Sequence, residues 1–434
     1  MKKIVLTLAS VLAATAFAPE AAAIPSFARQ TGMACNSCHF QTFPALTAFG
    51  RSFKTAGYTM MGAQGKVEGE HGLSIPDTLN ASIYVQLRYI KTGGKTDGYG
   101  GGKDTNYGRY DWPDEFALFF GGRVSENVGA LVEYGANWKL PMMFDVGGMK
   151  VGAVPFSTNG LGAGYGFDLF ATGSNGGGRI NENGMGYGAA LYMGSTNNPA
   201  ATGVALVAAN DDFHVNLTQY AATPSGSVNK LGGTYLRAAW TPNLGGMDVG
   251  VGIQNWSGNS SQFTANSATA PDPLADPNNA KEDKLMVIDG QAQGEYNGMP
   301  VGLYASYGTA AATSAGAAKT NTYNNGTKAK TALGLMADVW VMPATLGLQI
   351  GMMRAQTGQL TAAGAAETDN SFTIGAWYKL RQNVKLGFAY TKFSGTAYET
   401  TGSGGANAAN YSTDMTGNGE RGTSRMTMIL SAGF

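Results

Sequence analysis

The sequence ends with Arg425-Met-Thr-Met-Ile-Leu-Ser-Ala-Gly-Phe434, in which an apolar residue occupies every second position from Met426 onward. A period of two places alternate side chains on opposite faces of a strand, so this stretch predicts a β-strand with one apolar face. The same alternation begins again at Ile83, Met247 and Val384. It recurs over roughly 350 residues, which favours an all-β chain much larger than a β-sandwich of about 100 residues.

The composition agrees with a membrane protein that crosses with strands. Charged residues make up 13% of the 434 residues, against about 25% in typical globular domains, and 64 residues are glycine. The formal net charge is zero, which gives no basic excess for nucleic acid. Abundant aromatic residues without a long apolar run suit a transmembrane β-barrel. An alternating strand that ends in Phe434 resembles the assembly signal of bacterial outer-membrane barrels, which predicts the outer membrane of a Gram-negative cell.

The connections between the expected strands are of two kinds. Very short turns are expected at 125–127, 210–211, 297–298 and 381–383. Long polar loops are expected near 92–114, 258–283, 310–328 and 395–422. Short periplasmic turns that alternate with long external loops are typical of outer-membrane barrels. About 17 segments qualify as strands, and removal of either 144–154 or 163–172 gives an even number, about 16. We expect the removed segment to fold into the lumen, because residues 160–166 are rich in glycine.

Near the amino end, Cys35-Asn-Ser-Cys-His39 has the C-x-x-C-H spacing of a covalently attached c-type haem. The two thiols would bind the porphyrin as thioethers, and His39 would be the proximal iron ligand. Cys35 and Cys38 are the only cysteines, so a four-cysteine zinc site is impossible. A zinc site with His71 and His214 would be strained in spacing. A simple disulfide or redox dithiol is the remaining alternative.

The first residues indicate export. Lys2 and Lys3 precede an apolar stretch, 4–18, and three alanines, 21–23, which together predict a signal peptide over 1–23 with cleavage before Ile24. The apolar stretch is shorter than the roughly 20 residues of a membrane helix. The mature protein would therefore lie outside the inner membrane, where c-type haems are attached. We divide the chain into this signal, a monohaem cytochrome domain over 24–76 and a barrel over 77–434.

One helix is expected after the haem motif. Thr42 is its predicted cap, Pro44 its first residue, and Gly57 lies just past its end. Its apolar face consists of Leu46, Phe49 and Phe53. This face would pack on the porphyrin, although ordinary helix packing would give the same pattern. A domain of about 50 residues has a small hydrophobic core and needs an additional stabilising group such as haem.

The sixth ligand of the haem iron has four candidates. Met60 and Met61 follow the expected helix and are preferred, His71 is the next choice, and Met33 or an open position remains. A methionine thioether would raise the haem potential relative to a second histidine.

The haem domain has a size that suits a pore. A unit of about 50 residues has a diameter near 25 Å, comparable with the roughly 30 Å thickness of the hydrocarbon core. We therefore expect the domain to plug the barrel. The inward residues Arg88, Asp248, Gln254 and Lys385 would hold the plug or line water.

Several stretches resemble the fused outer-membrane cytochrome–porins of iron-oxidising bacteria. They are 24–35, 38–40, 43–46 and 49–51, with 119–123 and 151–156 in the barrel. The resemblance implies a single-haem cytochrome that plugs a barrel of about 16 strands. It also implies iron(II) oxidase or iron:cytochrome c oxidoreductase activity, with extracellular Fe(II) as donor and a periplasmic cytochrome c as acceptor. Cys35, Cys38 and His39 match directly, whereas no distal ligand and no iron-binding motif can be transferred.

Two other functions fit the same sequence. One is a conduit with another external redox partner, such as a mineral, an electrode or a sulfur species. The other is a diffusion porin in which the haem domain is a structural plug or a sensor. If Fe(II) is bound before oxidation, the candidate ligands are carboxylates of the long loops, which are more often only solvated. These acids are Asp97, Asp104, Asp272, Asp276, Glu399 and Asp414.

Overall fold

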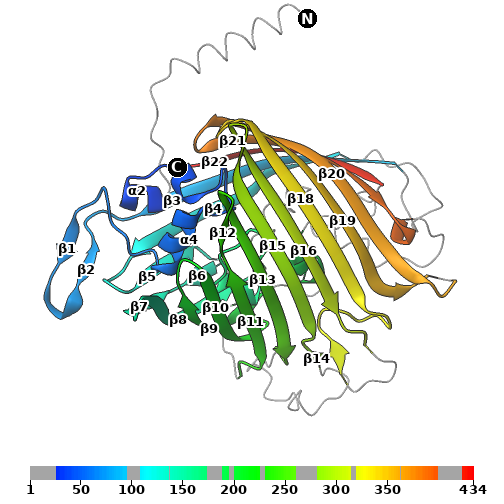
Figure 1. Ribbon diagram of the computed structural model, residues 1–434, viewed down its shortest axis with the longest axis horizontal. Coiled ribbons are helices and arrows are strands. Elements are labelled where there is room, and N and C mark those ends of the chain that lie inside the picture. The colour runs from blue at the N-terminus through cyan, green and yellow to red at the C-terminus, as the bar shows by residue number, and fades with distance from the viewer. Residues whose placement is uncertain are drawn as a thin grey trace, which may run out of the picture.

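The computed structural model describes residues 26–94, 108–135, 137–173, 188–194, 200–224, 230–260, 281–313, 319–361, 363–398 and 423–434. The signal expected over 1–23 lies outside this part of the chain, as do the six loop acids. The described residues form a large β-barrel with a small helical region at one end (Figure 1). No helix in the described ranges is both long and apolar enough to cross a membrane.

The barrel is closed and antiparallel. Its first strands are β3 (Ala81–Gly93), β4 (Gly108–Arg123), β5 (Gly129–Glu133), β6 (Asn137–Lys139), β7 (Met142–Val146), β8 (Met149–Thr158), β9 (Ala201–Ala209) and β10 (Phe213–Ala221). They are followed by β11 (Gly233–Trp240), β12 (Asn243–Leu244), β13 (Met247–Gly258), β15 (Leu285–Tyr296), β16 (Met299–Ala310), β18 (Lys330–Met342), β19 (Leu346–Leu360), β20 (Ala366–Arg381), β21 (Val384–Ser394) and β22 (Ser424–Gly433). Outside the barrel, β14 (Lys281–Glu282) pairs with β17 (Thr320–Asn321).

The number of barrel strands in the described residues is 16. Both β6 and β7 pair with β8 as two parts of one strand, and both β11 and β12 pair with β13. The last strand closes on the first, with Met428 opposite Tyr89 in the β22–β3 pair. The prediction of about 16 strands is therefore confirmed. Closure leaves no sheet edge, which is what a β-structure in lipid requires.

The alternation along the strands is inside out relative to a soluble protein. In β15, Ile288 is 53% exposed, whereas the next residue, Asp289, is 4% exposed. The outer face carries large apolar side chains, among them Leu206, Leu217, Leu236, Ile253, Leu303, Leu335, Ile350, Ile374, Phe388 and Leu430. The inner face carries polar ones, among them Gln86, Arg88, Asn216, Arg237, Gln254, Gln291, Gln349, Thr373 and Thr427. Apolar surface on this scale is stable only against lipid, so the protein is an outer-membrane barrel.

Exposed aromatic residues lie near both ends of the outer surface. Trp240 and Tyr296 end their strands beside short turns, while Tyr307 and Tyr390 lie toward the opposite end. Aromatic side chains of this kind mark the two membrane–water interfaces.

The two ends of the barrel differ as expected. At one end lie the turns 124–128, 147–148, 210–212, 245–246, 297–298, 343–345 and 382–383. The start of β3 and the end of β22 lie at this same end, and the long connections lie at the other. In outer-membrane barrels the short turns face the periplasm.

One long connection enters the barrel. Residues 163–173, including η2 (Ala163–Tyr165), are buried and form no barrel strand, whereas 149–154 belong to β8. Of the two segments proposed for removal from the strand count, 163–172 is therefore the one that folds inside. A second buried element, α6 (Ala189–Gly194), donates from Ala189 N to Ser306 Oγ at 2.9 Å.

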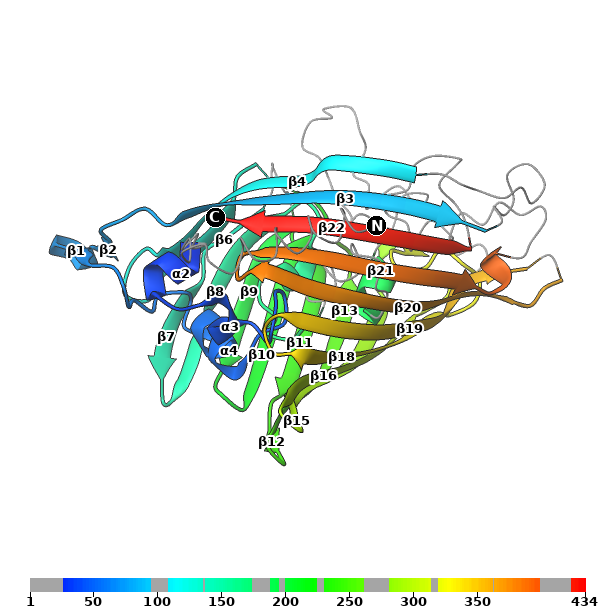
Figure 2. The ribbon, with the colours of Figure 1, turned by 90° about the horizontal axis from the view of Figure 1, so that it is seen from above.

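The N-terminal region contains α2 (Ser26–Thr31), α3 (Cys35–Cys38), α4 (Ala48–Thr55), β1 (Lys66–Glu68), η1 (Glu70–Gly72) and β2 (Ser74–Pro76). Seen from above, the three helices lie at the short-turn end of the strands (Figure 2). The hairpin of β1 and β2 projects away from the barrel (Figure 1).

The start of the predicted helix was wrong. Thr47, not Thr42, caps α4, because its Oγ1 accepts a hydrogen bond from Gly50 N at 3.1 Å. Pro44 precedes the helix in a turn closed by the Phe40 N to Ala45 O hydrogen bond, at 2.8 Å. Gly57 follows the helix with φ of 70°, as expected for a residue past the C-terminus.

The predicted apolar face is not a single helical face, because Leu46 precedes α4 and forms an isolated β-bridge with His39. Its residues have two environments. Phe53 is buried against Phe27 and Tyr58, with ring centroids 5.3 and 5.7 Å away, so it belongs to the domain's own core. Leu46 and Phe49 are half-buried. Of the predicted face, only these two are left for a bound group.

The apolar outer surface predicts that a charged side chain there lowers the free energy of unfolding, and that the loss is larger near the middle of the bilayer than near its edge. Leu335→Arg, in the middle of β18, should lower the unfolding free energy in lipid vesicles by about 2–4 kcal/mol. Leu244→Arg, beside the turn 245–246, should cost about 0–1 kcal/mol, because arginine there reaches the interface. Equal costs in reversible urea unfolding would contradict the membrane placement.

Candidate functional site

The two cysteines lie on a single helical turn. They occupy the first and last positions of α3, three residues apart, so their side chains leave the same face. Both thiols are free and half-buried, and burial raises the pKa of each. His39 follows at once with extended backbone, and its N–H donates to Cys35 O at 2.9 Å.

A close contact with α4 fixes this turn. A Cβ on Gly50 would lie 2.0 Å from Cys38 O, so only glycine permits the approach. Thr47 joins the two elements by donating from Oγ1 to Ser37 O at 2.7 Å and from N to Cys38 O at 3.0 Å. The capping residue of α4 therefore also holds the C-x-x-C-H segment.

The imidazole of His39 suits a metal ligand. Burial lowers its pKa to about 4, an effect that the carbonyl groups of Ala45 and Pro44 only partly offset. The ring is therefore neutral at neutral pH, which is the form that coordinates iron. Its Nδ1 atom is buried and makes no hydrogen bond of normal geometry within the described residues. Two free thiols on one face and a neutral, incompletely bonded imidazole fit a c-type haem.

The barrel wall contacts the segment at the short-turn end. Gln382, in the turn after β20, donates from Nε2 to Asn36 Oδ1 at 3.1 Å. Gln41 accepts from Ala344 N, in the turn after β18, at 2.6 Å. The C-x-x-C-H segment thus lies in the mouth of the barrel that faces the periplasm.

A second set of contacts fixes α4 to another part of the wall, at β13, and to the internal segment. Both terminal nitrogens of Arg51 donate to the carboxylate of Asp248, at 2.7 and 2.9 Å. Lys54 donates to Asp168 O, on the internal segment, at 2.5 Å. Of the four inward residues proposed as anchors, Asp248 binds the plug directly. Arg51 and Lys54 carried no sequence signal of this role.

The other proposed anchors have different surroundings. Arg88 pairs with Asp111 and Asp114 at 3.4 and 2.6 Å, within the wall. Lys385 lies 6.0 Å from the ring centroid of Phe43, in the N-terminal region.

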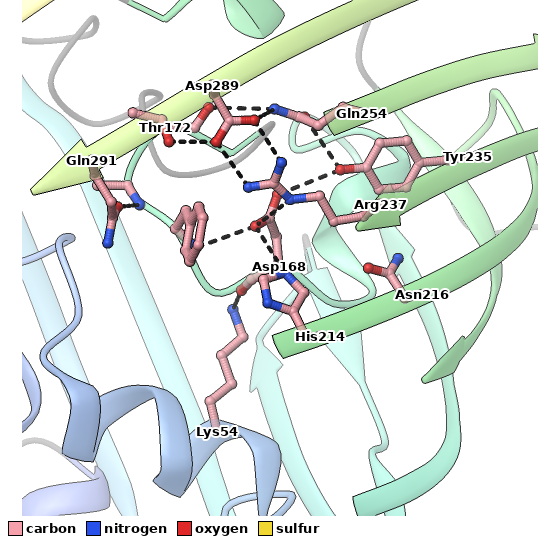
Figure 3. Close-up of polar contacts among 12 residues, drawn as sticks. Lys54, Asp168, Thr172, His214, Asn216, Tyr235, Arg237, Gln254, Asp289 and Gln291 are labelled. Carbon is pink, nitrogen blue, oxygen red and sulfur yellow. Dashed lines mark hydrogen bonds and ion pairs between the residues drawn. The ribbon is translucent and has the colours of Figure 1, made fainter. Parts of the chain in front are cut away.

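A buried polar network links the internal segment to the wall (Figure 3). Arg237 donates to both oxygens of Asp289 at 2.5 and 2.9 Å, and its Nε lies 3.3 Å from Asp168 Oδ1. Gln254 donates to the same Asp289 at 2.8 Å. His214 also lies in this network, with Nε2 4.0 Å from Asp168 Oδ1. From the sequence, a zinc site that combines His214 with the cysteines is predicted to be strained in spacing. Through Lys54 the plug is connected to this network.

The four candidates for the sixth ligand occupy different places. Met60 and Met61 lie in a half-buried segment beside α2, where Gln30 donates to Met60 O at 2.7 Å. Met33 lies just before α3 and is exposed. His71 is exposed in η1, within the projecting hairpin. The choice among them stays a prediction.

No protein-family model matches the chain, and no curated protein matches it. Among solved structures it is similar to Salmonella typhi OmpF in complex with daunomycin, with 11% identity, a TM-score of 0.46 and coverage of 85% of this chain and 100% of that one. A BenF-like porin from Pseudomonas fluorescens Pf-5 has 9% identity, a TM-score of 0.43 and coverage of 82% and 99%. OccK5 from Pseudomonas aeruginosa has 10% identity, a TM-score of 0.42 and coverage of 82% and 97%.

These similarities are too distant to carry an argument, and the class comes from the strand pairing itself. A closed barrel of 16 strands with an apolar outside and a polar inside is a porin-like barrel of the outer membrane.

The packing at Gly50 predicts that Gly50→Ala displaces α3. In haem-free protein, the alkylation rate of Cys35 and Cys38 should rise by a factor of about 5 to 150, since overpacking costs about 1–3 kcal/mol. Gly160→Ala is the matched control, because a Cβ there meets nothing within 4 Å. The same rate in both variants would show that the contact does not hold the segment.

The Arg51–Asp248 pair predicts a loosened plug when either partner is neutralised. Arg51→Gln and Asp248→Asn should each raise the ion conductance of reconstituted barrels, with a coupling of about 1–3 kcal/mol in the double-mutant cycle. Lys150→Gln removes an exposed ion pair of the same 2.7 Å length and should change neither quantity appreciably. Additive effects of the two plug variants would contradict direct anchoring.

Proposed function

We propose that this chain is a single-haem electron conduit of the outer membrane, which oxidises external Fe(II) and delivers the electrons to a periplasmic cytochrome c. The observation that carries the proposal is the C-x-x-C-H segment held in the mouth of a membrane barrel, between the turns 343–345 and 382–383. Cys35 and Cys38 would hold the haem by thioether bonds, and His39 would bind its iron. When bound, haem supplies reversible one-electron transfer.

The place of the segment favours direct access for a periplasmic acceptor. Asn36, between the two cysteines, is exposed, and the short-turn end is the periplasmic end of such barrels. A soluble cytochrome could therefore approach this mouth without entering the barrel.

The donor side has a different constraint. A strand of about 13 residues, tilted by about 40°, places the outer rim roughly 30 Å from the periplasmic mouth. Electron tunnelling falls steeply over such a distance. A small dissolved ion that enters the lumen suits this distance better than a mineral surface or an electrode, which must stay outside. This favours dissolved Fe(II) over the alternative external partners.

A diffusion channel with a structural plug is the second candidate. The contacts of Arg51 with Asp248 and of Lys54 with Asp168 suit a domain that closes a pore as well as one that carries electrons. Solute flux through reconstituted barrels that rises when the plug is loosened, without any haem reduction by Fe(II), would favour this second function.

The proposed activity predicts rapid reduction of the haem by its substrate. Anaerobically purified protein mixed with Fe(II) at the pH of growth should show the absorption bands of ferrous haem, and added oxidised cytochrome c should then be reduced. Cys35→Ser/Cys38→Ser should lose covalent haem and this activity while the barrel stays folded, since neither residue lies in a strand. Intact haem-loaded protein that Fe(II) in excess fails to reduce would reject the proposal.

A further inference from the structure

We propose that Lys379 and Lys385, on the inner wall of the barrel, bind the propionate groups of the haem and thereby set its orientation and potential. This inference rests on the proposed attachment of haem to Cys35 and Cys38. It assigns part of the cofactor site to the barrel, more than 300 residues away in the sequence.

The two lysines are direct neighbours across two strands. Lys379 of β20 is paired with Lys385 of β21, so their side chains leave the same face of the sheet. That face is the inner one, because Lys379 is 9% exposed and Trp377, two residues earlier, is buried too. Like charges directly opposite each other repel and destabilise the strand pair. An anion bound between the two lysines would relieve this repulsion.

Lys379 lacks such an anion within the protein. Among the described residues, no carboxylate oxygen lies within 4.0 Å of its Nζ, and its nearest described ring is that of Trp340, 5.9 Å away. A buried ammonium group without a counter-ion is costly, so this position favours binding of an external anion.

The lysines face the haem-attachment segment. The ring centroid of Phe43 lies 5.4 Å from that of His39 and 6.0 Å from Lys385 Nζ, so one side chain separates the two. The positive charges of both lysines act on His39, and that of Lys379 also acts on Cys35. Gln382, between the two strands, bonds to Asn36 at 3.1 Å.

The surrounding wall has the other property that haem requires. A cluster of buried apolar side chains lines this part of the barrel and contacts Phe40 and Ala45 of the plug. Its large members are Tyr304, Met336, Trp340, Trp377 and Ile429. Haem is an apolar macrocycle with two carboxylates at one edge. A wall with apolar side chains and two adjacent ammonium groups is complementary to both parts.

The experiment compares Lys379→Gln, Lys385→Gln and the double variant with Lys379→Arg. Lys330→Gln is the control, because Lys330 is also buried on the inner wall but contacts Tyr192 of α6. Covalent haem is quantified first, on denaturing gels. The midpoint potential and the infrared difference bands of the propionate carboxylates on reduction are then measured in the full-length haem-loaded protein.

We expect each glutamine variant to lower the midpoint potential, because a lost positive charge favours the oxidised haem, and to shift the propionate bands. The double variant should change both further, and Lys379→Arg should stay close to the unaltered protein. If the glutamine variants carry haem but have the same midpoint potential and propionate bands as the Lys330→Gln control, this inference is overturned and the proposed function is not. Absence of covalent haem from the unaltered protein would overturn the proposed function as well.

Discussion

The structure depends on one constraint, which is that a strand within lipid must find partners for all its backbone groups in its neighbours. The pairing of β22 with β3 meets it by closing the sheet. Closure makes an outside and an inside, and the period-two alternation then divides the side chains between lipid and lumen. Charged groups such as Arg237 and Asp289 become stable only because they face each other in the lumen. The polar lumen in turn supplies the partners that hold the internal segment and the plug.

Much of the barrel could be predicted from the sequence, because its period is local. The strand that contains Met428, the short turns and the choice of 163–172 as a possible internal segment all follow from patterns a few residues long. The start of α4 was harder to predict from the sequence. Thr42 and Thr47 are both acceptable caps by residue type, and the contact of Gly50 with Cys38 decides between them.

The candidate site also has a part that local sequence predicts and a part that depends on distant residues. The C-x-x-C-H spacing is local and identifies Cys35, Cys38 and His39 as candidates before any fold is known. Their surroundings are not local. Arg51 meets Asp248, and Lys54 meets Asp168, across separations of more than 100 residues, and nothing in the residue types marks those partners. The distal ligand of the proposed haem belongs to the same class, since the predicted order of preference among Met33, Met60, Met61 and His71 rests on their positions along the chain alone.

The seam between β22 and β3 also imposes an order of events on biogenesis. The two strands are at opposite ends of the polypeptide's barrel region, so the cylinder is completed only after the last of its strands has been translocated and presented to the insertion machinery. The helical domain occupies the mouth beside that seam. Under the proposed function, enzymes that attach haem to Cys35 and Cys38 would therefore have their widest access before the seam is sealed.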